Sequence, residues 1–197
     1  MAILITGGAR SGKSAFAEAA AVRLADNGIY LATLQPRDEE MAERVRLHRA
    51  QREQGELDWL TLETPSALVE QLRELAAQYA GSERPPVVLI DCLTLWLTNR
   101  MLALEGEDSD WRARQTEALD QATEELIRLC ADYPLPLLLV TNEVGSGIVP
   151  EYPLGRRFRD EAGRLNRRLA AVCERVYLVT AGIPVELKAI AARLDDL

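Results

Sequence analysis

The residues from Gly7 to Ser14 carry the clearest chemical signal in this sequence. They match the whole pattern G-x-x-x-x-G-K-[ST], which is typical of a phosphate-binding P-loop. Glycines allow several backbone N–H groups to converge on one anion, and the following helix adds its positive N-terminal end. An apolar run precedes the loop and a helical run follows it, so a nucleotide site is favoured over a simple glycine turn. The predicted phosphate-binding residues are Gly7, Gly8, Ala9, Arg10, Ser11, Gly12, Lys13 and Ser14.

A nucleotide held in this way needs charges and metal ligands around its phosphates. Lys13 can supply a mobile positive charge for the outer phosphates, and the Ser14 hydroxyl can ligate Mg²⁺. A second metal ligand is expected at the end of a buried strand, where Val87–Asp91 brings a carboxylate after four apolar residues. Ser14 and Asp91 are therefore the predicted metal ligands. The alternative is that Asp91 caps a helix beginning at Cys92, and one residue can fill both roles.

His48 is the sole histidine of the chain. On a helix, Arg44 and Arg52 would lie one turn on either side of it, and neighbouring cations favour the neutral imidazole. A neutral imidazole can attack phosphorus as a covalent nucleophile. From spacing alone, however, a lone histidine on a charged helix is more often a solvated surface residue. Both interpretations stay open at this point.

These residues depend on strands and helices to bring them together. Short apolar runs alternate with longer amphipathic stretches, which predicts an α/β fold with a mostly parallel central sheet flanked by helices. The predicted strands are Ala2–Thr6, Ile29–Ala32, Trp59–Leu62, Val87–Asp91, Leu135–Thr141 and Arg175–Val179. The predicted helices are Lys13–Asp26, Glu39–Gln54, Ser66–Tyr79, Asp110–Ala131 and Gly155–Cys173, with Asn27-Gly28 as the C-cap of the first and Pro65 opening the third.

The composition limits the classes of protein to consider. With 197 residues, of which 48% are hydrophobic and 27% charged, the chain is expected to form a single catalytic domain over residues 1–197. A net charge of −8 argues against general affinity for nucleic acid or anionic membranes. Apolar runs such as Leu135–Val140 are too short to span a bilayer. Because Met1 leads directly into the glycine loop, we expect no signal peptide and a cytoplasmic location.

Three further groups of residues are ambiguous. Cys92, Cys130 and Cys173 lie far apart, which favours reduced, partly buried thiols over disulfides or a zinc site. The three tryptophans, Trp59, Trp96 and Trp111, are more often core or interface residues than platforms for a large ligand. One helix is rich in arginines that could hold a phosphate or a neighbouring subunit, although a solvated face is the default. These arginines are Arg156, Arg157, Arg159, Arg164, Arg167 and Arg168.

Several segments, taken together and in order, resemble one family. They are Thr6–Ser14, Tyr30–Thr33, Glu40–Val45 with His48-Arg49, Leu89–Thr94, Val140–Pro150 and Phe158–Asn166. The family is the bifunctional adenosylcobinamide kinase / adenosylcobinamide-phosphate guanylyltransferase of cobalamin biosynthesis. The P-loop alone is generic, whereas its joint occurrence with the His48 segment and the T-N-E-V-G-x-G-I-V-P stretch is specific. The resemblance extends from residue 2 to about residue 183.

The resemblance implies a RecA-like P-loop NTPase fold and two reactions. ATP or GTP first phosphorylates the aminopropanol hydroxyl of adenosylcobinamide. GTP then transfers GMP to the corrinoid phosphate through a guanylyl-histidine intermediate, which would form on His48, and pyrophosphate is released. Besides the P-loop, the residues implied to line the nucleotide site are Tyr30, Leu31, Ala32, Thr33, Arg49, Ala50, Gln51, Arg52, Glu63 and Asp91. The P-loop motif predicts Mg²⁺ as cofactor. The resemblance implies a corrinoid substrate and a homotrimer, and it gives no role to the tail Glu186–Leu197.

Two other functions compete with this one. A simple P-loop kinase would phosphorylate a small molecule without forming a bond between protein and nucleotide. A nucleotide-dependent switch would hydrolyse slowly, phosphorylate no small molecule and require a partner protein. The strongest argument from the sequence against the switch is His48, set among cations in a chain with a complete P-loop.

Overall fold

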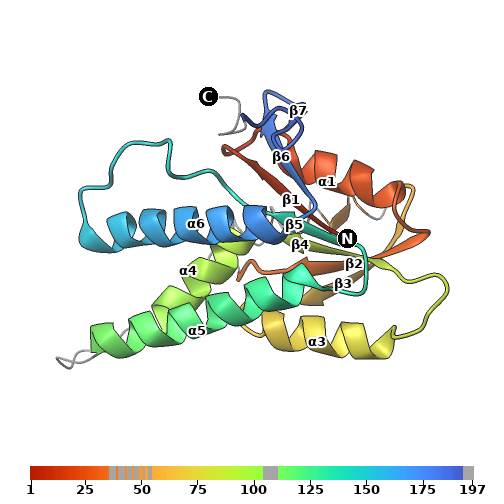
Figure 1. The fold of residues 1–197 in the computed structure, drawn as a ribbon, viewed down its shortest axis with the longest axis horizontal. Helices are drawn as coiled ribbons and strands as arrows, with labels where there is room; N and C mark the ends of the chain where they lie inside the picture. The colour runs from red at the N-terminus through yellow and green to blue at the C-terminus, as the bar shows by residue number, and fades with distance from the viewer. Residues whose placement is uncertain are drawn as a thin grey trace.

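A single mostly parallel sheet organises the molecule (Figure 1). The computed structural model describes residues 1–35, 39, 43, 46, 49, 50, 52, 55–103 and 111–192, with the side chains of residues 111–115 left out. Within this part of the chain the sheet has seven strands in the order β3-β2-β4-β5-β1-β6-β7, of which only β7 is antiparallel to its neighbour. The strands are β1 Ala2–Gly7, β2 Asn27–Ala32, β3 Asp58–Glu63, β4 Val87–Asp91, β5 Leu137–Val140, β6 Arg175–Thr180 and β7 Ile183–Glu186.

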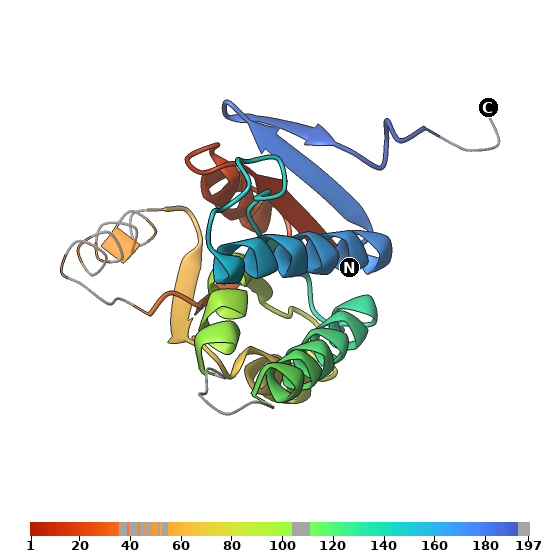
Figure 2. The same cartoon turned by 90° about the vertical axis from the view of Figure 1, so that its left-hand side faces the viewer.

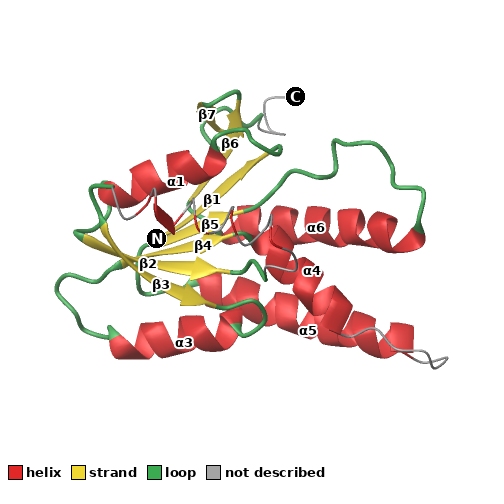
Figure 3. Ribbon diagram, turned by 180° about the vertical axis from the view of Figure 1, so that it is seen from behind, coloured by secondary structure: helices red, strands yellow, loops and turns green. Residues whose placement is uncertain are grey.

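Helices cover both faces of the sheet. They are α1 Lys13–Val22, α3 Leu68–Gln78, α4 Leu93–Ala103, α5 Trp111–Ala131 and α6 Pro153–Val172. Figures 1 and 3 show α1 on one face and the other four helices on the opposite side. Alternation along β1 explains the two layers, since Ile3 and Ile5 join the core that includes Ala17 of α1, whereas Leu4 packs with Leu72 of α3. The prediction of an α/β fold with flanking helices is confirmed.

The six predicted strands are all present, and their ends lie within two residues of the predicted ends. The predicted end of the first helix was wrong. α1 ends at Val22, and Asn27-Gly28 begins β2 instead of capping the helix. Packing explains Gly28, because a Cβ there would lie 2.5 Å from a ring carbon of Trp59 on β3. The third helix begins later than expected, at Leu68 after the N-cap Ala67, so Pro65 lies ahead of its first turn.

Two elements were not predicted. One is α4, whose buried residues Leu93, Trp96, Leu97 and Met101 recur at helical spacing. The other is β7, which pairs with β6 after a two-residue turn formed by Ala181 and Gly182 (φ 52° and 79°). An alanine is an unusual residue at positive φ, so the sequence lacks the ordinary hairpin signal. The predicted helix Glu39–Gln54 falls mostly outside the described residues, and those described within it are helical.

Some bulk expectations can also be compared with the structure. Cys92, Cys130 and Cys173 are free, buried thiols, as expected, and burial is the main cause that raises the pKa of each. Trp96 is a core residue with 1% of its surface exposed. Among the helices in the described ranges, none combines the length and apolar character that a membrane span requires.

Candidate active site

The carboxyl ends of the parallel strands gather the candidate residues at one edge of the sheet. The P-loop follows β1, Thr33 follows β2, and Asp91 is the last residue of β4. β5 lies between β1 and β4, so Asn142 and Glu143, which follow β5, fall between the P-loop and Asp91. Ligands of open α/β sheets bind at this edge. The topology therefore brings the predicted P-loop and the predicted metal-side carboxylate to a common site.

The P-loop has the geometry that its glycines require. Gly12 is the N-cap of α1 and adopts a left-handed conformation with φ 95°. A Cβ on Gly7 would lie 2.4 Å from the carbonyl oxygen of Val179 and 2.6 Å from the Ser11 hydroxyl. Lys13 is 9% exposed, and its ammonium donates a hydrogen bond to the Gly8 carbonyl at 3.1 Å. The lysine charge is thus folded back over the loop that the motif assigns to phosphate.

The hairpin of β6 and β7 supports the loop from outside. The N–H of Gly182, in the turn of the hairpin, donates to the carbonyl oxygen of Ser11 at 2.9 Å. Figure 2 shows the tip of this hairpin beside the start of α1. The segment after β5 is tied to the same loop, since the N–H of Glu143 donates to the Gly7 carbonyl at 3.0 Å. Two distant parts of the chain thus fix the shape of the P-loop.

Asp91 lies in a cluster of polar groups that the sequence only partly predicted. The Tyr30 hydroxyl donates to Oδ2 of Asp91 at 3.1 Å, and the Arg52 guanidinium stacks on the Tyr30 ring, with its carbon 3.5 Å from the ring centroid. Burial, and next the negative charge of Asp91, raise the pKa of the Tyr30 phenol above its ordinary range. The phenol therefore stays protonated and keeps its role as a donor.

Glu18 belongs to this cluster and was missed. Burial raises the pKa of its carboxyl group, the positive charge of Arg52 lowers it, and the negative charge of Asp91 raises it. The side chain lies one helical turn after Ser14 on α1, and residues four apart share a helix face. That spacing is the signal in the sequence that could have found it.

The end of β2 braces the backbone around Asp91. The Thr33 hydroxyl accepts a hydrogen bond from the Cys92 N–H at 2.8 Å and donates one to the Cys92 carbonyl at 2.7 Å. The Asn99 side-chain amide donates to the Thr33 carbonyl at 2.9 Å. Thr33 and Leu31 are fully buried. The buried side chains of Leu31 and Thr33 therefore stabilise the end of the strand. Of the predicted site residues Leu31, Ala32 and Thr33, Ala32 alone has a partly exposed side chain, so the other two would contact a ligand through their backbone.

The remaining predicted residues are spread more widely. Glu63 ends β3 and is exposed; the pairing register sets both it and Asp91 beside Ala32, on opposite sides of β2. Two strand spacings separate their backbones, about 10 Å. Arg49 is exposed, Ala50 is half-buried and Arg52 is buried. His48 and Gln51 lie outside the described residues.

The segment after β5 was part of the family pattern but received no site role. The Asn142 side-chain amide donates to the Thr94 hydroxyl at 2.9 Å, which joins this segment to the start of α4. The Glu143 carboxylate accepts a hydrogen bond from the Gly145 N–H at 3.0 Å. The guanidinium of Arg159, on the arginine-rich helix α6, donates to the Gly145 carbonyl at 2.8 Å. At least one of those arginines thus holds the loop beside the site.

The residues present suit a magnesium ion. Ser14 and Asp91 offer hard oxygen donors, and Tyr30 occupies only one oxygen of the Asp91 carboxylate. Within the described ranges no group of three or more histidine, cysteine or acidic side chains could by itself hold a metal. Mg²⁺ is commonly held by one or two protein oxygens together with substrate phosphates, so this sparse donor set fits it.

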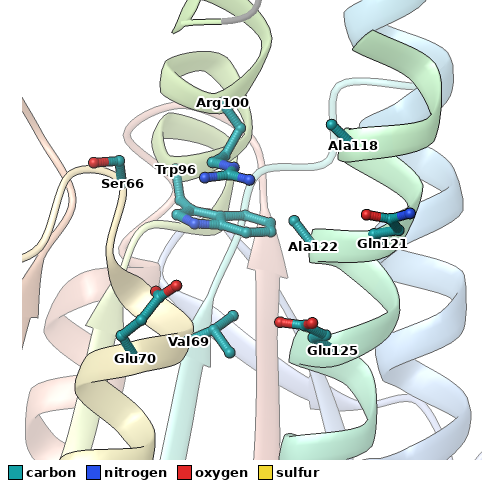
Figure 4. A pocket seen from close by; sticks show the side chains of 9 residues that line it. All are labelled: Ser66, Val69, Glu70, Trp96, Arg100, Ala118, Gln121, Ala122 and Glu125. Atoms are coloured by element: carbon teal, nitrogen blue, oxygen red, sulfur yellow. The ribbon is translucent and has the colours of Figure 1, made fainter. Parts of the chain in front are cut away.

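A cavity of about 150 Å³ lies elsewhere, between α3, α4 and α5 (Figure 4). Its walls include Val69, Trp96, Arg100 and Glu125, and none of the predicted site residues. The candidate active site is therefore defined by the sheet edge and not by this cavity.

Comparison with known proteins agrees with this geometry. The model of the family "Cobinamide kinase / cobinamide phosphate guanyltransferase" matches residues 3–187. The bifunctional adenosylcobalamin biosynthesis protein CobU of Salmonella typhimurium is 43% identical over 192 residues, which are 95% of this chain and 100% of the relative. The corresponding protein CobP of Pseudomonas aeruginosa is 43% identical over 188 residues, 94% of this chain and 96% of the relative.

Proposed function

The chain belongs to the cobinamide kinase / cobinamide phosphate guanyltransferase family, and from this premise we propose that it catalyses both reactions at one nucleotide site. The first is phosphorylation of the aminopropanol hydroxyl of adenosylcobinamide by ATP or GTP. The second is transfer of GMP from GTP to the resulting phosphate. The whole chain acts as one catalytic domain, in the cytoplasm, and as a homotrimer.

The kinase step depends mainly on position and charge. The P-loop N–H groups and Lys13 hold the outer phosphates. Ser14 and Asp91 would hold Mg²⁺, which would supply positive charge against the charge developing on the transferred group. The substrate oxygen attacks the γ-phosphorus in line, an O–P bond forms, and the bond to the β-phosphate oxygen breaks. A carboxylate near the P-loop can accept the hydroxyl proton, and Glu18 and Glu143 are the candidates that the sheet edge offers.

The guanylyl transfer requires a different bond to break. A nitrogen of neutral His48 attacks the α-phosphorus of GTP, a P–N bond forms, and pyrophosphate leaves. An oxygen of the corrinoid phosphate then attacks the same phosphorus, the P–N bond breaks, and His48 is restored. The covalent intermediate replaces one difficult displacement, by the corrinoid phosphate on GTP, with two easier steps.

One observation carries the structural part of this proposal. A complete P-loop, tied through Glu143 to the segment after β5, lies at the same sheet edge as Asp91, whose carboxylate keeps one oxygen free of the Tyr30 hydroxyl. This arrangement supports a site in which phosphate donors and a metal-side carboxylate act together.

Replacing His48 by alanine tests the covalent step. We expect His48→Ala to abolish guanylyl transfer while kinase activity stays within about twofold of wild type, because the γ-phosphoryl transfer uses Lys13, Ser14 and Asp91 instead. The measurement is retention of radiolabel on denatured protein after treatment with α-phosphate-labelled GTP, together with product masses from adenosylcobinamide.

Kinase activity serves as the internal control for folding of the variant. The label on the wild-type protein should be acid-labile and alkali-stable, as expected of a phosphoramidate. A stable label on His48→Ala would rule out the covalent histidine. A wild-type protein that phosphorylates the substrate and never retains label would be a simple kinase.

A further inference from the structure

Tyr30 lies between two groups with separate tasks in the proposed reactions. Its hydroxyl donates to Oδ2 of Asp91 at 3.1 Å, and its ring face carries the Arg52 guanidinium, whose carbon is 3.5 Å from the ring centroid. Both side chains are enclosed, with 7% of Tyr30 and 5% of Arg52 exposed. The Tyr30 ring also meets Trp59 edge-on, with 6.0 Å between centroids, so it has little freedom to turn.

Burial of the Arg52 guanidinium has a free-energy cost. A charged group that leaves water loses its hydration, and only hydrogen-bonding or oppositely charged groups of the protein can replace it. Its Nε has no hydrogen-bond partner among the described residues. The charge is instead balanced by the ring face of Tyr30 and by the nearby carboxylates of Asp91 and Glu18. Arg52 is therefore held where it is largely by Tyr30 and the acidic cluster.

The position of Arg52 in the chain gives this contact a consequence. Arg52 follows His48 by four residues in the sequence, and residues 49, 50 and 52 are helical. Whatever fixes the Arg52 side chain also restricts the backbone of residues 49 and 50, which come directly after His48 in the sequence. The contact that fixes it reaches, through one aromatic ring, to the carboxylate at the end of β4.

We propose that Tyr30 is a positioning residue that couples the Asp91 carboxylate to the segment carrying His48, with Arg52 as the link. The Tyr30 hydroxyl engages one oxygen of Asp91 and so orients the other toward the P-loop side, while its ring holds Arg52. Movement of Arg52 off the ring then loosens the hydroxyl from Asp91. The inference rests on the proposed function, because it assigns roles to Asp91 and His48.

A double-mutant cycle tests the coupling with a readout that is independent of turnover. The variants are Tyr30→Phe, which removes only the hydroxyl, Arg52→Lys, which keeps the charge and loses the planar stack, and their combination. Mn²⁺ affinity is measured by electron paramagnetic resonance in the presence of a non-hydrolysable GTP analogue. The rate of covalent labelling from α-labelled GTP is measured on the same proteins.

The coupling predicts a particular pattern. Tyr30→Phe should weaken Mn²⁺ binding on the order of fivefold, as for loss of a hydrogen bond to a charged group. Arg52→Lys should weaken it by about threefold in the wild-type background and by nothing further when Tyr30 is already Phe, because no hydroxyl remains to transmit the change. Arg52→Lys should also slow covalent labelling by about tenfold, since the stack no longer holds residues 49, 50 and 52, which follow His48 in the sequence.

Tyr133→Phe is the matched control. It also removes a buried tyrosine hydroxyl, which donates to the Leu72 carbonyl at 2.9 Å between α3 and the end of α5, and it should leave Mn²⁺ affinity unchanged. If Arg52→Lys fails to fold, Arg52→Gln takes its place. It removes the charge as well as the stack, so only the part of its effect on Mn²⁺ affinity that disappears in the Tyr30→Phe background counts toward the coupling.

The outcomes separate this inference from the function on which it rests. Additive effects of the two substitutions, or unchanged Mn²⁺ affinity in Tyr30→Phe, would overturn the coupling while the wild-type protein still performed both reactions. A wild-type protein that performed neither reaction would instead overturn the proposed function, and Mn²⁺ binding would still show whether the Tyr30 hydroxyl orients Asp91.

Discussion

Asp91 connects the observed site with the proposed function. One of its carboxylate oxygens accepts a hydrogen bond from Tyr30, and in the proposed function the other oxygen would hold the cation. The cost of placing this charge near Glu18 is offset by Arg52, whose positive charge lowers the pKa of the Glu18 carboxyl. At the scale of single residues, the site is a small set of opposite charges that hold one another in place around the phosphate loop.

Asp91→Asn tests the role of that charge. The amide keeps an oxygen that can accept from Tyr30, so the local structure should persist and nucleotide binding should stay measurable. Turnover should fall on the order of 10²-fold, and its dependence on Mg²⁺ concentration should become weak, because a neutral amide is a poor magnesium ligand. The measurement is the Mg²⁺ titration of the kinase rate. An unchanged titration would assign the metal to another carboxylate, among which Glu18, Glu63 and Glu143 are the candidates.

At the scale of elements, the P-loop is a strand-to-helix connection whose conformation is stabilised by contacts with other elements. The β6–β7 hairpin contacts it through Gly182 and Val179, and the segment after β5 contacts it through Glu143. The motif predicted the loop, but it could not predict these supports. The hairpin depends on a turn with Ala181 at positive φ, which the sequence does not indicate. α4 begins two residues after the end of β4, so no loop sequence separates the two elements and marks the start of the helix.

Gly7→Ala tests the contact between the loop and the hairpin. The added Cβ would lie 2.4 Å from a backbone oxygen of Val179, so either the loop or β6 must move. We expect a loss of stability of about 1–3 kcal/mol and a nucleotide affinity at least about tenfold lower. Thermal unfolding and calorimetric titration with GTP measure the two effects.

Gly163→Ala is the matched control for that substitution. Gly163 lies within α6, and a Cβ there would meet nothing within 4 Å. Alanine in a helix interior is favoured over glycine by about 1 kcal/mol, so this variant should be at least as stable as wild type and bind GTP equally well. Equal behaviour of the two variants would show that Gly7 has no special steric role.

At the scale of the whole molecule, strand order decides which residues meet. The P-loop and Asp91 were predictable because each has a local signature, a glycine motif or an apolar strand that ends in a carboxylate. Contacts such as that between Tyr30 and Arg52 depend on how β2 and a later segment pack, and no local pattern encodes them. Thr33 is a residue that the family pattern included in the nucleotide site, whereas in the structure its side chain is buried and hydrogen-bonded to the backbone of Cys92.

Lys13→Ala tests whether one nucleotide site serves both reactions. The sequence has a single P-loop, and the sheet gathers Ser14, Asp91 and the segment after β5 around it. Removing the ammonium should lower both the kinase rate and covalent labelling from GTP by about 10²-fold or more, since each reaction needs the positive charge of Lys13 at the outer phosphates of its nucleotide.

Lys188→Ala is the control, because Lys188 is the only other lysine of the sequence and it donates to the Cys173 carbonyl, in the connection between α6 and β6. Near-normal labelling of Lys13→Ala, with its kinase activity lost, would mean that the GTP that guanylylates the protein binds at a second site. Parallel loss of both activities, in a variant that unfolds at the wild-type temperature, would establish that the phosphates of the two nucleotides occupy the same loop in turn.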